Sequence, residues 1–129
     1  MFKANTVKNP NDILREEILQ ERAAVLGRAG RSVMATLEQL QAIEEGIEAS
    51  LAGFSRFCEG SDTACGSVQR HRIVQEINGE IRRYNKTREL AKLRFYYLIV
   101  TREALGLRKH QRVEEIYRIP PSRKYLQQG

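Results

Sequence analysis

Apolar side chains recur every seventh residue along the first half of the chain, the spacing of one face of a long helix. The face consists of Leu19, Leu26, Val33, Leu40, Ile47 and Phe54, with Ala23, Leu37 and Leu51 at its second position. Asn11 or Asp12, just after Pro10, is a suitable N-cap. The pattern keeps its phase through four glycines, although each costs about 1 kcal/mol relative to alanine. We expect one helix over about residues 12–55, with Gly27 to Gly30 as the place where it bends and where a neighbouring backbone approaches closely.

A second amphipathic pattern starts after a segment of loop composition. Residues 56–66, RFCEGSDTACG, are rich in Gly, Ser, Asp and Thr and predict a loop. Spacings of three and four then connect Val74, Ile77, Ile81, Tyr84, Ala91, Phe95, Leu98 and Leu105. The stripe is interrupted only at Arg88 and Arg102. It continues through Asn78-Gly79, a pair that favours a hairpin turn between strands, so we expect a helix over about residues 67–105 with Gly106 as its cap.

The end of the chain predicts a short helix followed by an extended tail. Val113, Ile116 and Tyr117 share one face of a helix over about residues 109–117, which is expected to pack back on the long helices. The two prolines of RIPPSRKYLQQG end helical structure and favour an extended segment over residues 118–129, with Tyr125 and Leu126 as candidate anchors. The predicted fold is all-α: an antiparallel, coiled-coil-like hairpin of long helices within a single domain, residues 1–129.

The stretch FYYLIV, residues 95–100, is apolar on more sides than one partner helix covers. Phe95 and Leu98 belong to the stripe, whereas the other four residues point elsewhere. A helix that is apolar on all sides is a buried helix, so the C-terminal segment or a second chain has to cover it. We expect a homodimer of two hairpins that forms a four-helix bundle. The candidate dimer interface is Phe95, Tyr96, Tyr97, Leu98, Ile99 and Val100.

Charge differs strongly between the two halves of the chain. Residues 1–66 contain seven Lys and Arg and ten Asp and Glu, whereas residues 67–129 contain fifteen and six. An acidic first helix and a basic second helix favour antiparallel pairing. The basic half also suggests phosphate binding. The candidate nucleic-acid contacts are Arg82, Arg83, Lys86, Lys92, Arg94, Arg108 and Lys109.

Residues 101–117, TREALGLRKHQRVEEIY, resemble a helix-turn-helix DNA-binding motif, with ALGL at the turn and RKHQRVEEIY as the recognition helix. The resemblance covers this segment alone and implies a basic dimer that binds nucleic acid. Two positions depart from the motif, because Arg102 and Arg112 stand where a small and an apolar residue are usual. The alternative interpretation is that Gly106 ends the long helix and the next helix packs on the hairpin.

Side chains suited to catalysis or metal binding are few. Cys58 and Cys65 lie in the predicted loop, and His71 and His110 lie near opposite ends of the second long helix. This set lacks the spacing and the fourth ligand of a zinc site, and it predicts neither a metal nor a cofactor. No catalytic triad, phosphate-binding glycine loop or metal-carboxylate motif is recognisable, so we expect no enzymatic activity.

The expected function is therefore that of a helical protein-interaction or scaffold module acting as a homodimer, with a basic nucleic-acid-binding dimer as the alternative. The N-terminus has no apolar signal-peptide core, and no apolar run approaches the roughly 20 residues of a membrane-spanning helix. We expect a cytoplasmic protein with no membrane partner.

Overall fold

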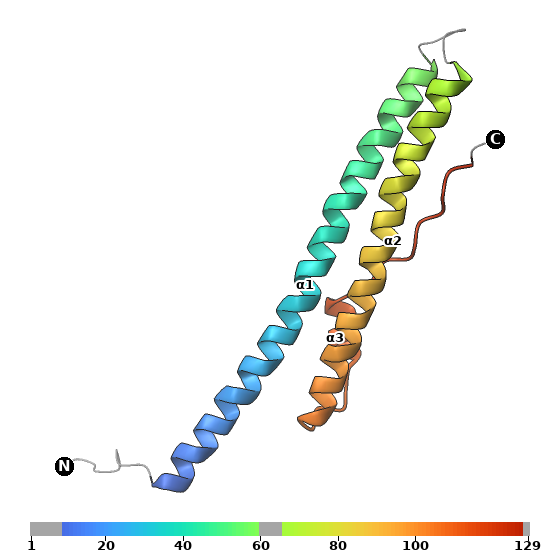
Figure 1. Ribbon diagram of the computed structural model, residues 1–129. Helices are drawn as coiled ribbons and strands as arrows, with labels where there is room; N and C mark the ends of the chain where they lie inside the picture. The colour runs from blue at the N-terminus through green and yellow to red at the C-terminus, as the bar shows by residue number, and fades with distance from the viewer. Residues whose placement is uncertain (1–8, 60–65, 128–129) are drawn as a thin grey trace.

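Two long antiparallel helices run side by side and form most of the molecule (Figure 1). The computed structural model describes residues 9–59 and 66–127. They contain α1 (Pro10–Glu59), α2 (Ser67–Ala104) and α3 (Gln111–Ile116), and no β-strand. The predicted all-α hairpin is confirmed, although α1 continues past residue 55 and residues 60–65 of the predicted loop lie outside the described part. No helix in this part has both the length and the apolar content needed to cross a membrane.

The start of α1 differs from the sequence prediction, because the N-cap is Asn9 and neither Asn11 nor Asp12. The side-chain Oδ1 of Asn9 accepts a hydrogen bond from the backbone N–H of Asp12 at 2.9 Å. Pro10 is the first helical residue, a position that suits proline because the N–H it lacks has no partner there. The prediction was wrong because it placed the proline before the cap.

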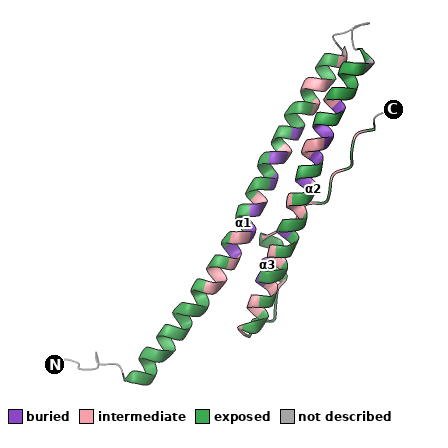
Figure 2. Cartoon of the chain, in the orientation of Figure 1, coloured by how far each residue is buried: buried purple, intermediate pink, exposed green. Residues whose placement is uncertain are grey.

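The seam between α1 and α2 is the heptad face predicted from the sequence. Its main buried cluster consists of Leu40, Ile43, Ile47, Ile77, Ile81, Tyr84 and Ala91. Figure 2 shows buried positions along the facing sides of the two helices and exposed positions on their outer sides. α2 runs without a break through Asn78 and Gly79, which confirms that this pair is helical here.

A Schellman motif ends α2 at the predicted glycine. Gly106 has a φ of 90°, a conformation that favours glycine. Its N–H donates to the Glu103 carbonyl at 3.0 Å, and the Leu107 N–H donates to the Arg102 carbonyl at 2.9 Å. These two bonds satisfy carbonyls that the helix itself leaves without partners. The chain then turns back toward the hairpin.

α3 packs against both long helices. Val113 is buried in a second cluster with Val33 of α1 and Leu98 of α2, and Tyr117 packs against the edge of this cluster. Gly30 of α1 admits the Tyr117 ring, because a Cβ at Gly30 would lie 2.8 Å from the Tyr117 hydroxyl. The close neighbour of Gly30 is therefore a side chain from the C-terminal segment, and not the backbone that the sequence led us to expect.

The two arginines that interrupt the apolar stripe of α2 both hold the C-terminal segment. Arg102 donates from Nη2 to the Lys109 carbonyl at 2.8 Å and from Nε to His110 Nδ1 at 3.3 Å. Arg88 donates from Nε to the Pro120 carbonyl at 2.6 Å. Beyond Pro120 the tail runs extended along α2 and antiparallel to it (Figure 1).

Candidate functional site

The six residues of the candidate dimer interface divide between the interior and the surface. Leu98 is buried, and Phe95 and Ile99 are half-buried, all against the cluster that includes α3. The exposed members are Tyr96, Tyr97 and Val100, with exposed fractions of 61%, 56% and 42%. The C-terminal segment thus covers part of FYYLIV and leaves the rest at the surface of the chain.

The exposed part of this stretch belongs to a longer apolar stripe on the outer side of α2. Leu93, Tyr97 and Val100 follow one another at spacings of four and three, and all three are exposed. We call these three residues the outer stripe, which Leu90 flanks with an exposed fraction of 37%. Sequence reasoning missed Leu93 because it considered the contiguous run only. The helical spacing from Leu93 to Val100 was the available signal.

α1 extends beyond the level at which α2 ends, and its residues 10–24, which we call the overhang, are all exposed (Figure 2). Leu19 has the same heptad position as the buried Val33 and Leu40, yet it is 63% exposed. Ile18 beside it is 51% exposed. Leu19 is exposed whereas Val33 and Leu40 are buried because α2 ends at Ala104 and does not reach the level of Leu19. The overhang therefore continues a helix-packing surface past the end of its partner helix.

The tail lies in a groove on α2 where two asparagines bind its backbone. Asn78 donates from Nδ2 to the Leu126 carbonyl at 3.0 Å, and its Oδ1 accepts from the Leu126 N–H at 2.7 Å. Asn85 makes the same pair of bonds with Arg123, at 3.0 and 2.9 Å. Each side-chain amide thus satisfies both backbone groups of one tail residue. We call Asn78 and Asn85 the asparagine clamps.

Arg123 connects the tail to α1. Its guanidinium lies between two carboxylates, with Nη1 at 3.0 Å from Glu44 Oε1 and Nη2 at 3.0 Å from Glu48 Oε1. The charge pattern predicted that acidic residues of the first helix face basic residues of the second. The structure instead gives these two glutamates a partner from the tail.

Tyr84 lies beneath the tail and is 1% exposed. Its hydroxyl donates a long hydrogen bond, 3.4 Å, to the Pro121 carbonyl. Burial raises the pKa of Tyr84 above its usual 10.0, and the negative charge of Glu44 adds to this effect. Arg123 and Arg88 act in the opposite direction. The phenol is therefore held in its neutral form.

The candidate nucleic-acid contacts do not form one surface. Arg94 turns toward α1, where it donates to Thr36 Oγ1 at 2.6 Å. Arg83 and Lys92 form ion pairs with glutamates three residues earlier on α2. The other candidates are exposed: Arg82, Lys86, Arg108 and Lys109. About 33 Å of helix separates Arg82 from the end of α2, so nucleic-acid binding stays a prediction.

The helix-turn-helix-like segment contains the end of α2, a turn and the six residues of α3. Val113 of α3 is buried against the hairpin, and Arg112 is exposed. Gly106 ends α2 and the short helix packs back on the hairpin, which is the alternative arrangement described above.

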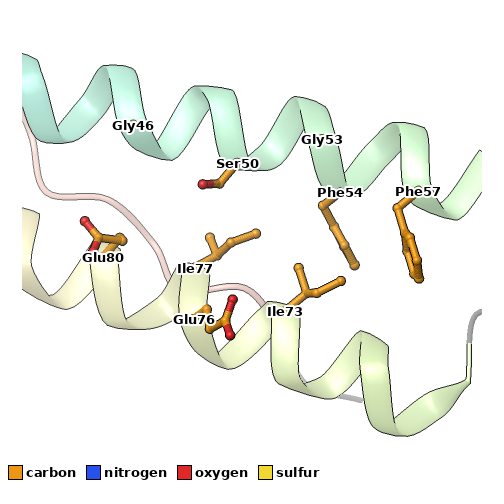
Figure 3. Close-up of a pocket in the computed structure, with 9 residues that line it drawn as sticks. All are labelled: Gly46, Ser50, Gly53, Phe54, Phe57, Ile73, Glu76, Ile77 and Glu80. Atoms are coloured by element: carbon orange, nitrogen blue, oxygen red, sulfur yellow. The ribbon is translucent and has the colours of Figure 1, made fainter.

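A further groove, of about 720 Å³, opens between α1 and α2 near their connecting ends (Figure 3). Its lining residues are Gly46, Ser50, Gly53, Phe54 and Phe57 of α1 and Ile73, Glu76, Ile77 and Glu80 of α2. A Cβ at Gly46 or Gly53 would meet no atom within 4 Å. These two glycines are therefore not required for the contact between the helices. The lining includes no histidine, cysteine or lysine that would complement the two carboxylates.

The cysteine and histidine side chains do not belong to a metal site in the described part of the chain. No three His, Cys, Asp or Glu side chains of this part gather as a metal site. Cys58 is half-buried near the end of α1, and Cys65 lies outside the described residues. His71 is exposed on α2, whereas His110 Nε2 lies 3.3 Å from Glu103 Oε2.

Comparisons of the chain with protein-family models, with curated proteins and with solved structures found no match.

Proposed function

We propose that this protein is a helical interaction module that acts as a homodimer, in which the outer stripes of two α2 helices face each other across a twofold axis. The observation that carries the proposal is the exposure of Tyr97 and Val100 after α3 has covered the opposite side of the same stretch. Apolar side chains at helical spacing on an otherwise charged surface are typical of helix–helix interfaces. Two such hairpins would form a four-helix assembly with the two α2 helices at its centre.

Charge complementarity supports a second copy of this chain as the partner. Val33 and Leu98 pack together and so mark one level along the hairpin. Glu17 lies 16 residues before Val33 on α1, and Arg82 lies 16 residues before Leu98 on α2. Because the helices are antiparallel, Glu17 and Arg82 are each about 24 Å from that level, in opposite directions along the hairpin. A twofold axis at this level brings Glu17 of one copy level with Arg82 of the other. The same reasoning places Glu21 of one copy level with Lys86 of the other.

The overhang has the composition that this arrangement needs. It contains four acidic and two basic residues, and the outer side of α2 near Arg82 and Lys86 is basic. The overhang of one copy and the basic part of α2 in the other lie at the same level but in different helix layers, so their charges attract over a distance and form no direct ion pairs. This attraction favours the antiparallel orientation, while the outer stripe supplies the apolar contact.

Sedimentation equilibrium tests the interface. The unmodified chain should give about twice its 14.9 kDa mass at micromolar concentration. Tyr97→Glu should yield a folded monomer, because it places two carboxylates across the axis. Val68→Glu is the matched control, since Val68 is also an exposed apolar residue of α2 but lies near the connecting end. A chain that stays monomeric at about 100 μM would refute the proposal.

Charge exchange tests the orientation. Glu17→Lys with Glu21→Lys, or Arg82→Glu with Lys86→Glu, should each weaken self-association by placing like charges at the same level. A mixture of the two double variants should associate more tightly than either alone, because both sets of pairs are restored in the heterodimer. An equimolar mixture that associates no better than its components would exclude this twofold arrangement.

A further inference from the structure

The tail groove recognises the backbone of an extended chain more than its side chains. Each asparagine clamp binds the N–H and the carbonyl of one residue, Leu126 or Arg123. A peptide in a helix has both groups engaged with its own backbone, so the clamps select extended peptide. Because the clamps bind backbone N–H and carbonyl groups, they do not discriminate between side chains at the two residues that they hold.

The spacing of the clamps matches the spacing of an extended peptide. Asn78 and Asn85 are seven residues apart, which is about 10.5 Å along a helix. Arg123 and Leu126 are three residues apart, or about 9–10 Å in a polyproline or strand conformation. Pro120, three residues earlier again, is bound by Arg88. The contacts thus recur every third residue, the period of a polyproline helix.

Two tail side chains add selectivity to this backbone recognition. The Arg123 guanidinium binds Glu44 and Glu48 at once, and Leu126 packs against the main buried cluster of the hairpin. Lys124 and Tyr125 between them are exposed. The chemistry that the groove selects is therefore an extended Arg-x-x-Leu segment.

We propose that this groove is a peptide-binding site for an extended Arg-x-x-apolar segment of another protein, and that the chain's own tail is an occupant that such a segment displaces. The buried members of the main cluster all come from α1 and α2, so departure of the tail removes only the partly buried Ile119 and Leu126 from its edge. The contact of Val113 with Val33 and Leu98 does not involve the tail. Departure exposes the clamps to water, which satisfies their amides. The site lies apart from the outer stripe, and the proposal does not depend on dimerisation.

Competition in the chain of residues 1–129 tests the proposal. The probe is a fluorescein-labelled peptide of residues 118–127, followed by fluorescence anisotropy. The unmodified chain should bind it weakly, because the tethered tail competes at an effective concentration on the order of millimolar. Arg123→Ala in the chain weakens the tethered tail and should raise the affinity for the unmodified peptide at least about fivefold, since more of the groove is open.

Two further variants identify the site. Adding Asn85→Ala to the Arg123→Ala chain should lower peptide affinity about thirtyfold, because both hydrogen bonds of one clamp are lost. Lys124→Ala is the matched control, since Lys124 is an exposed neighbour of Arg123, and this chain should bind the peptide as weakly as the unmodified one. A peptide that carries alanine in place of its arginine should bind the Arg123→Ala chain at least about fivefold more weakly than the unmodified peptide does.

The proposal is overturned if the Arg123→Ala chain, folded by circular dichroism, shows no saturable binding up to millimolar peptide, or if Asn85→Ala leaves the affinity unchanged. Either result would make the tail a structural strap only. Sedimentation of the same samples reports the homodimer separately, so failure of one proposal is distinguishable from failure of the other.

Discussion

Replacing Asn78 by alanine removes one asparagine clamp with little change to the helix. The side chain is 7% exposed and makes both of its tail hydrogen bonds to Leu126, at 3.0 and 2.7 Å. A hydrogen bond of this kind contributes about 1 kcal/mol net, so docking of the tail end should weaken by about 2 kcal/mol. The loss has an upper limit, because Leu126 regains hydrogen bonds to water once the tail end leaves.

Hydrogen exchange at the Leu126 amide measures this loss directly. A change of about 2 kcal/mol should speed its exchange about thirtyfold. Urea denaturation followed by circular dichroism, at a fixed chain concentration, should show a decrease in unfolding free energy of at most the same size. Asn78→Ala combined with Asn85→Ala should cost less than the sum of the single changes if the tail leaves as a unit.

Gln69→Ala is the control for this measurement. Gln69 is exposed on α2 nine residues before Asn78 and does not line the groove that holds Leu126, so its loss should leave the Leu126 amide as protected as before. If Asn78→Ala changed the unfolding free energy by less than about 0.5 kcal/mol and left exchange at Leu126 unaltered, the clamp geometry described here would be wrong.

Two other predictions concern the glycines and the buried tyrosine. Gly46→Ala should stabilise the chain by up to about 1 kcal/mol through helix propensity, whereas Gly30→Ala should destabilise it because its Cβ would lie 2.8 Å from the Tyr117 hydroxyl. Adding Tyr117→Phe should recover much of the Gly30→Ala loss in thermal denaturation, and no recovery would locate the strain elsewhere. Because burial raises the pKa of Tyr84, the unfolded state releases this proton first, and unfolding free energy should fall as pH rises above about 10. Tyr84→Phe should reduce that fall in urea titrations between about pH 9 and 11, and an unchanged pH dependence would contradict the assigned burial.

The long helices and their pairing were predictable from the sequence because they depend on a local, repeated pattern. Leu40 and Ile47 of α1, and Ile77 and Ile81 of α2, recur at spacings that only a helix places on one side. Their apolar area has to leave water whatever else the chain does. Gly106 was predictable as a helix end for a similar reason, since glycine adopts the required positive φ without strain.

The partners of polar residues on those helices were decided by the tertiary structure. Asn78, Asn85 and Arg88 look in the sequence like solvent-facing or misplaced positions, because the groups that they bind are backbone N–H and carbonyl groups that every residue carries. The exposure of Leu19 could not be predicted from the sequence for a related reason. Its heptad position is that of a core residue, and only the level at which α2 ends leaves it in water. A periodic pattern specifies which side of a helix is apolar, whereas the packed chain determines how far along that side a partner extends.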